Sequence, residues 1–235
     1  MRAAAAVLTA ICATAAAQEN PYFEGYVDLW TPVLHMLDPT QVEAAHRRGE
    51  EVWFYVCCVP RGRVPNLFID QPAVEHRLLF WMAERFGLDG FLYWRATFWE
   101  TRDPWTETRS LTRRGTSFGC GDGTLLYPPV RRPGSKDKTV TGPVESIRWE
   151  MLRDGIEDRE YFFLLRGTMR RLSMPPRDRD AYRFLFGQAR EMHNLPQRLV
   201  RSITNYENDP AVLHRARALP GATLEALSRF LEEKK

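Results

Sequence analysis

The sequence has few cysteines, little net charge and no long apolar run, and each of these absences removes a class of protein. Its 4 cysteines show no C-x-x-C spacing, so no zinc site is indicated. The formal net charge is +3, and basic residues are interleaved with acidic ones, which argues against a nucleic-acid-binding surface. No apolar stretch is long enough to span a membrane. We expect neither a cofactor nor a metal ion.

Aromatic residues, in contrast, are plentiful and occur in clusters along the sequence. They make up 12% of the chain and include 7 tryptophans. The stretch DGFLYWRATFWETRDPW, from Asp89 to Trp105, is the densest of these clusters. A buried core strand is the ordinary explanation for such a stretch. The alternative is a platform on which the flat faces of the rings contact a sugar.

The order of the expected elements predicts an α/β fold with a parallel sheet. Apolar runs that fit strands alternate with amphipathic helices over the first hundred residues or so, and only helices follow a long loop over residues 100–142. The expected strands are Val7–Thr14, Gly25–Trp30, Glu51–Val59 and Gly90–Trp99. The expected helices are Pro39–Glu50, Gln71–Gly87, Pro143–Leu172, Asp178–His193 and the tail from Asp209.

Two of the helices carry apolar stripes at helical spacing. The members of the first stripe, on the helix Pro143–Leu172, are Trp149, Leu152, Ile156 and Phe163. Those of the second, on the helix Asp178–His193, are Tyr182, Leu185, Phe186, Ala189 and Met192. The acidic residues of the first helix, with its arginines, are interpreted as surface pairs; they are Asp154, Glu157, Asp158 and Glu160, with Arg148, Arg153 and Arg159.

This number of strands predicts the C-terminal half of a (β/α)8 TIM-type barrel over residues 1–172, followed by helices over 173–235 that pack on it. Half a barrel has open sheet edges, so either a missing N-terminal half-barrel completes it or the chain self-associates. Residues Met1–Gln18 allow two interpretations. They resemble a weak signal peptide of a secreted or periplasmic protein, or they contain a strand at an internal start of a longer protein.

Candidate binding residues follow from the rule that function lies at the carboxyl ends of barrel strands. Aromatic faces, carboxylates and an amide suit a carbohydrate better than a phosphate group. Asp28 is expected to be buried and therefore paired or functional. Each tryptophan could instead be core, and Asp122 could be a turn residue between two glycines. The candidates are Asp28, Trp30, Tyr55, Asn66, Tyr93, Trp94, Trp99 and Asp122.

The motifs at these strand ends resemble a known family. They are VDLWTP, EVWFYVCCVP, PNLFID, DGFLYW, DPW, GDGTLLYP and SIRWEMLRDGIEDREYFFLL. In this order they are similar to the C-terminal part of the catalytic domain of glycoside hydrolase family 123, over roughly Gly25 to Leu172. The family's type members are β-N-acetylgalactosaminidases, so the resemblance implies a (β/α)8 barrel and a glycan that contains N-acetylhexosamine.

The resemblance also implies a substrate-assisted, retaining mechanism, in which the acetamido oxygen of the substrate attacks the anomeric carbon. In the family an adjacent Asp-Glu pair, upstream of these motifs, orients that group and supplies the general acid. These 235 residues contain no Asp-Glu pair. We therefore assign no catalytic residue and expect the isolated chain to be inactive. Two alternatives are a non-catalytic carbohydrate-binding or scaffold fragment, and an interaction module that pairs through its sheet edge.

Overall fold

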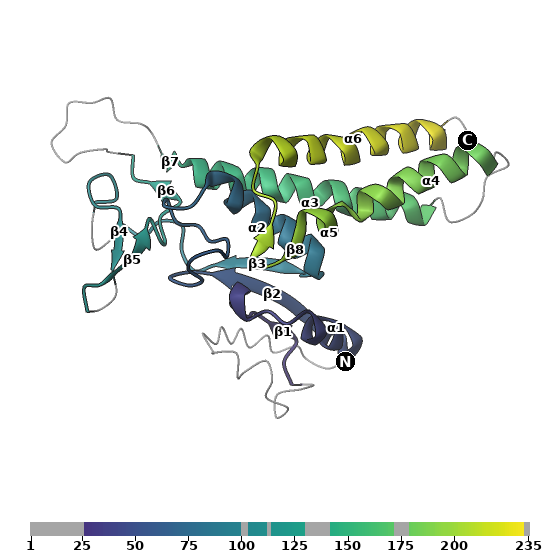
Figure 1. Ribbon diagram of the computed structural model, residues 1–235. Coiled ribbons are helices and arrows are strands. Elements are labelled where there is room, and N and C mark those ends of the chain that lie inside the picture. Colours follow the sequence, from purple (N-terminus) through teal and green to yellow (C-terminus); the bar gives the residue numbers. More distant parts are fainter. Residues whose placement is uncertain (1–25, 100–102, 112–113, 130–141, 172–178, 233–235) are drawn as a thin grey trace.

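A small parallel sheet lies at the centre of the computed structural model, which describes residues 26–99, 103–111, 114–129, 142–171 and 179–232 (Figure 1). Its three strands stand in chain order, β1 (Leu29–Trp30), β2 (Glu51–Val56) and β3 (Gly90–Tyr93). Both pairings are parallel, as predicted. The strand expected at Val7–Thr14 lies outside the described residues. The α/β class is confirmed, and within the described ranges the strands do not close into a barrel.

Two helices connect the strands of this sheet. Helix α1 (Pro39–Arg48) follows a short 3-10 turn, η3 (Leu34–Met36), and its first turn is capped by Asp38, whose carboxylate accepts the Thr40 N–H at 2.8 Å. Helix α2 (Ala73–Phe86) connects β2 to β3. Each helix ends at a glycine, as the sequence predicts.

The main core lies between the helices and one face of the sheet. Phe54 of β2 contacts Phe91 of β3, with ring centroids 5.0 Å apart, and Phe91 in turn contacts Phe80 of α2 at 5.6 Å. Because side chains alternate along a strand, Trp53 and Tyr55 point to the opposite face. Buried residues from α1, β2, α2 and the C-terminal region share this core, among them Val42, Ala45, Val52, Val56, Leu78, Leu199 and Leu213.

Three long helices form the other part of the molecule (Figure 1). They are α3 (Ile147–Arg171), α4 (Arg179–His193) and α6 (Pro210–Glu232). A short helix, α5 (Leu195–Leu199), and the hairpin β8 (Val200–Ser202) and β9 (Asn205–Tyr206) connect α4 to α6. All five residues of the stripe predicted on α4 pack in a second core with α3 and α6, whose buried members are Leu165, Ala189, Leu227 and Phe230.

The stripe predicted on α3 is split by the structure. Leu152 is buried in the main core, whereas Trp149, Ile156 and Phe163 are exposed. The buried side of α3 is rotated toward Leu152 and Phe162, because α3 packs simultaneously on α2 and α6. Of the four residues predicted to share this stripe, only Leu152 thus faces the core.

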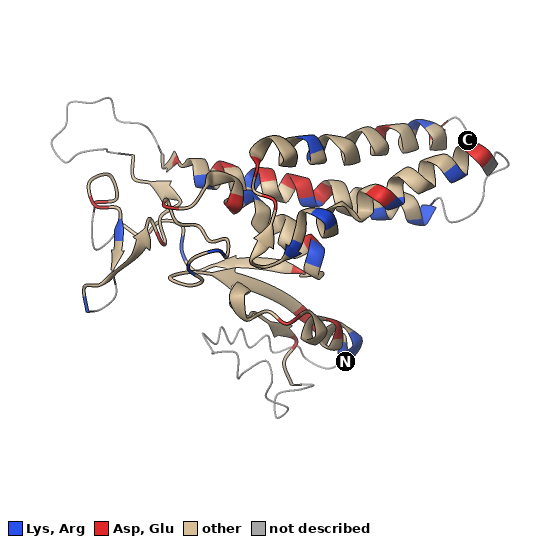
Figure 2. Ribbon diagram, viewed as in Figure 1, with Lys and Arg blue, Asp and Glu red and all other residues tan. Residues whose placement is uncertain are grey.

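A buried ion cluster joins three helices and corrects the prediction of surface pairing on α3. Asp158 is buried, and it accepts hydrogen bonds from Arg77 of α2 at 2.5 and 2.7 Å and from Trp81 at 2.8 Å. Arg217 of α6 also donates to it, at 2.8 Å. Figure 2 shows acidic and basic residues interleaved along the long helices. None of the described helices is apolar over a length sufficient to cross a bilayer.

The long loop predicted over residues 100–142 contains ordered strands. Strands β4 (Arg109–Leu111) and β5 (Ser117–Cys120) form an antiparallel hairpin. Strand β6 (Leu126–Tyr127) pairs with β7 (Val144–Glu145), which directly precedes α3. These strands lie beyond the carboxyl end of β3, so they bring the loop over the sheet edge where binding residues were expected (Figure 1).

Candidate functional site

The candidate site is centred on the buried carboxylate of Asp122. Its Oδ1 accepts one hydrogen bond from the Tyr93 hydroxyl and one from Trp94 Nε1, each at 3.0 Å. Its own backbone N–H donates to the Ser110 hydroxyl at 3.0 Å. Together with Gly123 we call these residues the Asp122 cluster. It joins the end of β3, the β4–β5 hairpin and the turn after β5, and the structure thereby brings together three of the predicted residues.

The turn that carries Asp122 requires its two flanking glycines. Gly121 and Gly123 have φ angles of 79° and 76°, in the left-handed region that residues with a Cβ rarely adopt. A Cβ on Gly121 would lie 2.7 Å from the guanidinium of Arg148, and one on Gly123 would lie 2.4 Å from the Trp94 ring. The Gly123 N–H also donates to the Tyr93 hydroxyl at 2.8 Å. The close contact with Trp94 therefore depends on Gly123.

Arg148 of α3 anchors this turn, a role that no pattern in the sequence indicates. It is buried, and it donates to the backbone carbonyls of Leu67 and Gly121, each at 2.7 Å, and to that of Thr124. It was predicted to be a partner in surface ion pairs, which is wrong. A guanidinium with donors in a fixed fork can satisfy several carbonyls at once. Arg148 therefore fixes the turn relative to the loop after β2.

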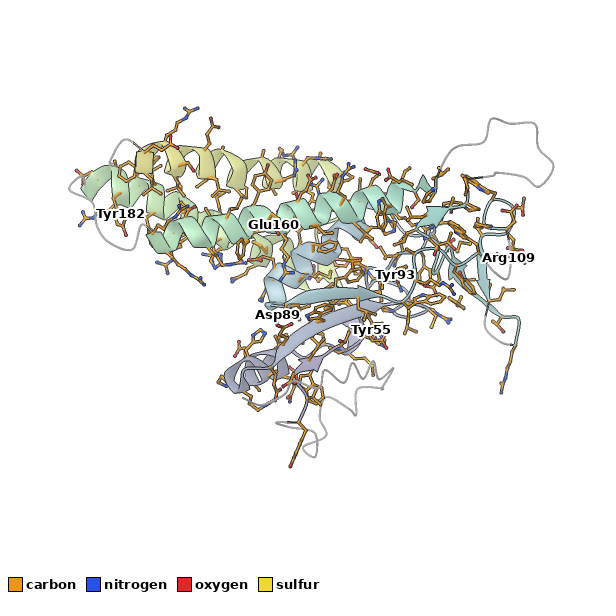
Figure 3. The ribbon with its side chains drawn as sticks, turned by 180° about the vertical axis from the view of Figure 1, so that it is seen from behind. Tyr55, Asp89, Tyr93, Arg109, Glu160 and Tyr182 are labelled. Carbon is orange, nitrogen blue, oxygen red and sulfur yellow. The ribbon has the colours of Figure 1, made fainter. Side chains whose placement is uncertain are left out.

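Burial controls the protonation of the cluster. Burial raises the pKa of the Tyr93 phenol, and the charge of Asp122 raises it further, so Tyr93 stays a neutral hydrogen-bond donor. Burial also raises the pKa of the Cys57 thiol to about 12, with contributions from Cys58 and Asp122. The carboxyl end of β2, where Cys57 lies, is thus within electrostatic range of Asp122. Figure 3 shows Tyr55 on β2 and Tyr93 on the neighbouring strand β3.

Trp94 presents an open aromatic face beside the buried carboxylate. Its side chain is 44% exposed, and its ring lies 5.2 Å from that of Phe98. Trp99 is half-buried, and its Nε1 donates to a backbone carbonyl of β6 at 2.8 Å. The ring centroids of Trp105 and Tyr127, further along the loop, are 4.6 Å apart. Aromatic rings therefore continue from the end of β3 into the loop above it.

Asn66 and Tyr55 belong to the loop after β2 and to β2 itself. Asn66 is buried, and its Nδ2 donates to the carbonyls of Cys57 and Pro60, each at 2.8 Å, while its Oδ1 accepts the N–H of Leu67 at 2.7 Å. These bonds lie within the loop after β2, so the amide holds that loop in shape. Tyr55 is buried in β2, on the face opposite the main core.

Asp28 and Trp30 lie near the other end of the sheet, contrary to the expected grouping. Trp30 pairs with Val52 at the beginning of β2, and its Nε1 donates to Glu50 at 2.8 Å. Asp28 is exposed, so the prediction that it is a buried carboxylate is wrong. The physical reason is that the chain continues past Trp30 to Val33, which still pairs with β2. The parallel pairing with β2 therefore continues past Trp30, further along the chain than the apolar pattern indicates.

The arrangement offers hydrogen-bonding groups beside an aromatic face. A carboxylate, a hydroxyl and an indole N–H meet where the end of β3 contacts the turn after β5, and the exposed ring of Trp94 belongs to the same group. Such a combination of apolar surface and a few convergent polar groups is typical of small-molecule sites. Across the ranges that the structure describes, no group of His, Cys, Asp and Glu residues is arranged to hold a metal ion.

Comparison with protein families identifies the class to which this site belongs. The model described as "Glycoside hydrolase 123, catalytic domain" matches residues 2–165, which is more than half of the chain. The protein is thus a domain of the glycoside hydrolase class, whose substrates are carbohydrates. Within that class the chain belongs to glycoside hydrolase family 123, as its motifs predicted. A search among curated proteins gives no match.

Proposed function

We propose that the Asp122 cluster binds an N-acetylhexosamine residue of a glycan. The observation that carries the proposal is the geometry of Asp122, which accepts hydrogen bonds from Tyr93 and Trp94 while the Trp94 ring remains 44% exposed. The membership of the family supports a carbohydrate ligand. The apolar C–H face of a sugar ring would rest on Trp94, with its hydroxyl groups near the polar groups of the turn.

The other predicted contacts divide into three groups. Tyr55 and Trp99 are proposed as walls of the acetamido-binding region, because they lie on the strand and loop that flank Tyr93. Asn66 acts indirectly, by holding the loop after β2. Asp28 and Trp30 lie near the opposite end of the sheet and stay outside the proposed site.

Hydrolysis is not proposed for these residues alone. The substrate-assisted, retaining mechanism that the resemblance implies uses an adjacent Asp-Glu pair, and the sequence contains none. A glycoside hydrolase activity of the whole protein would then need an acid from outside these 235 residues. The alternative is a non-catalytic carbohydrate-binding or scaffold role for the same residues.

We further propose that residues 1–172 are a sector of a (β/α)8 barrel, with residues 173–235 packed on it. Strands β1, β2 and β3 are parallel and follow one another in chain order. Helices α1 and α2 share one core with the same face of the sheet, which leaves the other face to point toward a barrel interior. A second half-barrel or a second copy of the chain would complete the sheet.

Isothermal titration calorimetry with N-acetylgalactosamine and N-acetylglucosamine oligosaccharides tests the proposal. We expect saturable binding to the wild-type chain, and a loss of at least tenfold in affinity for Trp94→Ala, which corresponds to about 1.4 kcal/mol. Phe184→Ala, a change of an exposed aromatic residue on α4, is the matched control and should leave the affinity unchanged. Equal affinities for both variants would place the sugar elsewhere.

Activity is measured separately, with aryl N-acetylhexosaminides as substrates. We expect no turnover by the 235-residue chain. Turnover that survives rigorous purification would show that the general acid lies within these residues, and it would overturn the proposed division between binding and cleavage.

A further inference from the structure

Helix α3 carries an exposed apolar stripe that the glycan site does not use. Trp149, Ile156 and Phe163 are 36%, 49% and 62% exposed, and they are spaced by seven residues, which is close to two helical turns. Leu164 is also exposed, beside Phe163. We call Trp149, Ile156 and Phe163 the α3 stripe. Large apolar side chains left exposed along one side of a helix are a feature of interaction surfaces.

The stripe lies away from the side of α3 that packs in the protein. Leu152, Phe162 and Leu165 are buried and face the two cores. At 100° per residue, the stripe is turned roughly a third of a revolution or more from the centre of that buried side. The stripe is therefore an outer face of the helix, which no other part of the described ranges covers.

We propose that the α3 stripe is the interface of a two-fold symmetric dimer, in which the α3 helices of two copies pack antiparallel about Ile156. Trp149 and Phe163 are equally distant from Ile156 along the helix. An antiparallel pairing about that point sets Ile156 against its counterpart, and sets Trp149 of each copy against Phe163 of the other. The stripe is thus complementary to itself, as an isologous interface requires.

The charges beside the stripe agree with the same symmetry. Arg153 follows Trp149 by four residues and Glu160 follows Ile156 by four, so both lie on one edge of the stripe. Both side chains are exposed, and Figure 3 shows Glu160 in the middle of α3. The antiparallel pairing brings Arg153 of one copy next to Glu160 of the other, twice. A parallel pairing would instead put these same edges on opposite sides of the seam, so Arg153 and Glu160 could not pair between the copies.

The size of the surface determines the strength of the association. Helix α3 has 25 residues and is therefore about 37 Å long at 1.5 Å per residue. A single helix face of this length is at the low end of interface size, so the dimer should dissociate on dilution. The interface is separate from the Asp122 cluster, and glycan binding and dimerisation can be measured independently.

Sedimentation velocity on the full chain, at several protein concentrations, tests the proposal. We expect a concentration-dependent dimer in the wild type and a monomer for Ile156→Glu, which puts two like charges at the two-fold axis. Phe184→Glu is the control, because Phe184 is exposed on α4 and lies off the stripe. It should leave the dimer intact. Circular dichroism confirms that each variant is folded.

Charge reversal gives a second test that does not depend on an apolar substitution. Arg153→Glu alone and Glu160→Arg alone should each weaken the dimer several-fold, because each change sets like charges opposite one another. The double variant restores opposite charges and should recover the wild-type dissociation constant. A wild-type chain that stays monomeric throughout, or a dimer that Ile156→Glu leaves unchanged, would overturn the proposal. A double variant no tighter than the single variants would contradict the antiparallel register.

Discussion

Arg148 donates a hydrogen bond to the backbone carbonyl of Gly121 at 2.7 Å. Arg148 lies in α3, whereas Gly121 lies in the turn after β5, earlier in the chain. Through this bond the turn that holds Asp122 is tied to α3, and through the bond to the Leu67 carbonyl it is tied to the loop after β2. The position of the candidate site thus depends on one buried cation.

Replacement of Arg148 should therefore destabilise the protein and loosen the turn. We expect Arg148→Met to lower the free energy of unfolding by about 3 kcal/mol, because several buried carbonyls lose their donor. Urea denaturation measures this change. The control is Arg153→Met on the same helix, where the side chain is exposed, and it should cost less than about 1 kcal/mol. Similar losses for both variants would contradict the anchoring role.

Substitution of Gly123 should displace Trp94. Gly123→Ala introduces a Cβ that would lie 2.4 Å from the Trp94 ring, at a φ angle of 76°. The control is Gly115→Ala, where φ is 78° but no atom lies within 4 Å of the added Cβ. Both variants carry about 1 kcal/mol of backbone strain, and only Gly123→Ala adds the clash. We expect a changed near-ultraviolet circular dichroism spectrum and weaker glycan binding for Gly123→Ala alone.

The ion cluster around Asp158 should contribute to stability only while it is complete. Asp158→Asn leaves Arg77 and Arg217 without their shared carboxylate, and we expect a loss of about 3–5 kcal/mol. Glu225→Gln breaks an exposed pair with Arg229 on α6 and should cost less than about 0.5 kcal/mol. Thermal and urea unfolding distinguish the two. A small effect at Asp158 would mean that the cluster is open to water.

Stability should fall in mild acid because of His76. Burial lowers its pKa to about 4 from an ordinary value of 6.5, although its Nε2 donates to the Phe68 carbonyl at 3.1 Å. Between these values the unfolded chain binds a proton that the folded chain refuses, so the free energy of unfolding decreases as the pH falls through that window. The difference amounts to about 3 kcal/mol in full.

Denaturation at a series of pH values from neutral down to the pKa of folded His76 checks this prediction. His76→Gln removes the titrating group and should flatten the dependence in that window. His214→Gln is the matched control, because His214 is exposed and its removal should leave the slope unchanged. An unaltered slope in His76→Gln would show that other groups govern the acid response.

The sequence allowed the elements to be predicted well and the site less well. Helix α1 and helix α2 begin and end within two residues of the predicted bounds, because Pro39, Pro72, Gly49 and Gly87 mark them locally. Tyr93 and Trp94 were found because they follow directly on an apolar strand. Patterns within a few neighbouring residues were sufficient to predict both the helix bounds and these two site residues.

The missed features depend on contacts between distant segments. No local pattern shows that Arg148 is buried, because its partners belong to two loops far upstream in the chain. Trp30 was predicted to lie at the carboxyl end of its strand, because the apolar run ends there. The pairing with β2 in fact continues to Val33. The stripe on α3 has the period of a core helix, and periodicity alone cannot distinguish a face that packs within the chain from one left outside.

The hydrogen bond from Arg217 to Asp158 has a practical consequence for anyone who prepares this domain. The family match ends at residue 165, whereas Arg217 comes from α6 and completes an ion cluster that begins at Arg77. Buried residues of the main core likewise come from beyond the match, Leu199 and Leu213 among them. A recombinant chain cut at the family boundary would thus lose part of its own interior. The limit of sequence similarity is not the limit of the cooperative folding unit.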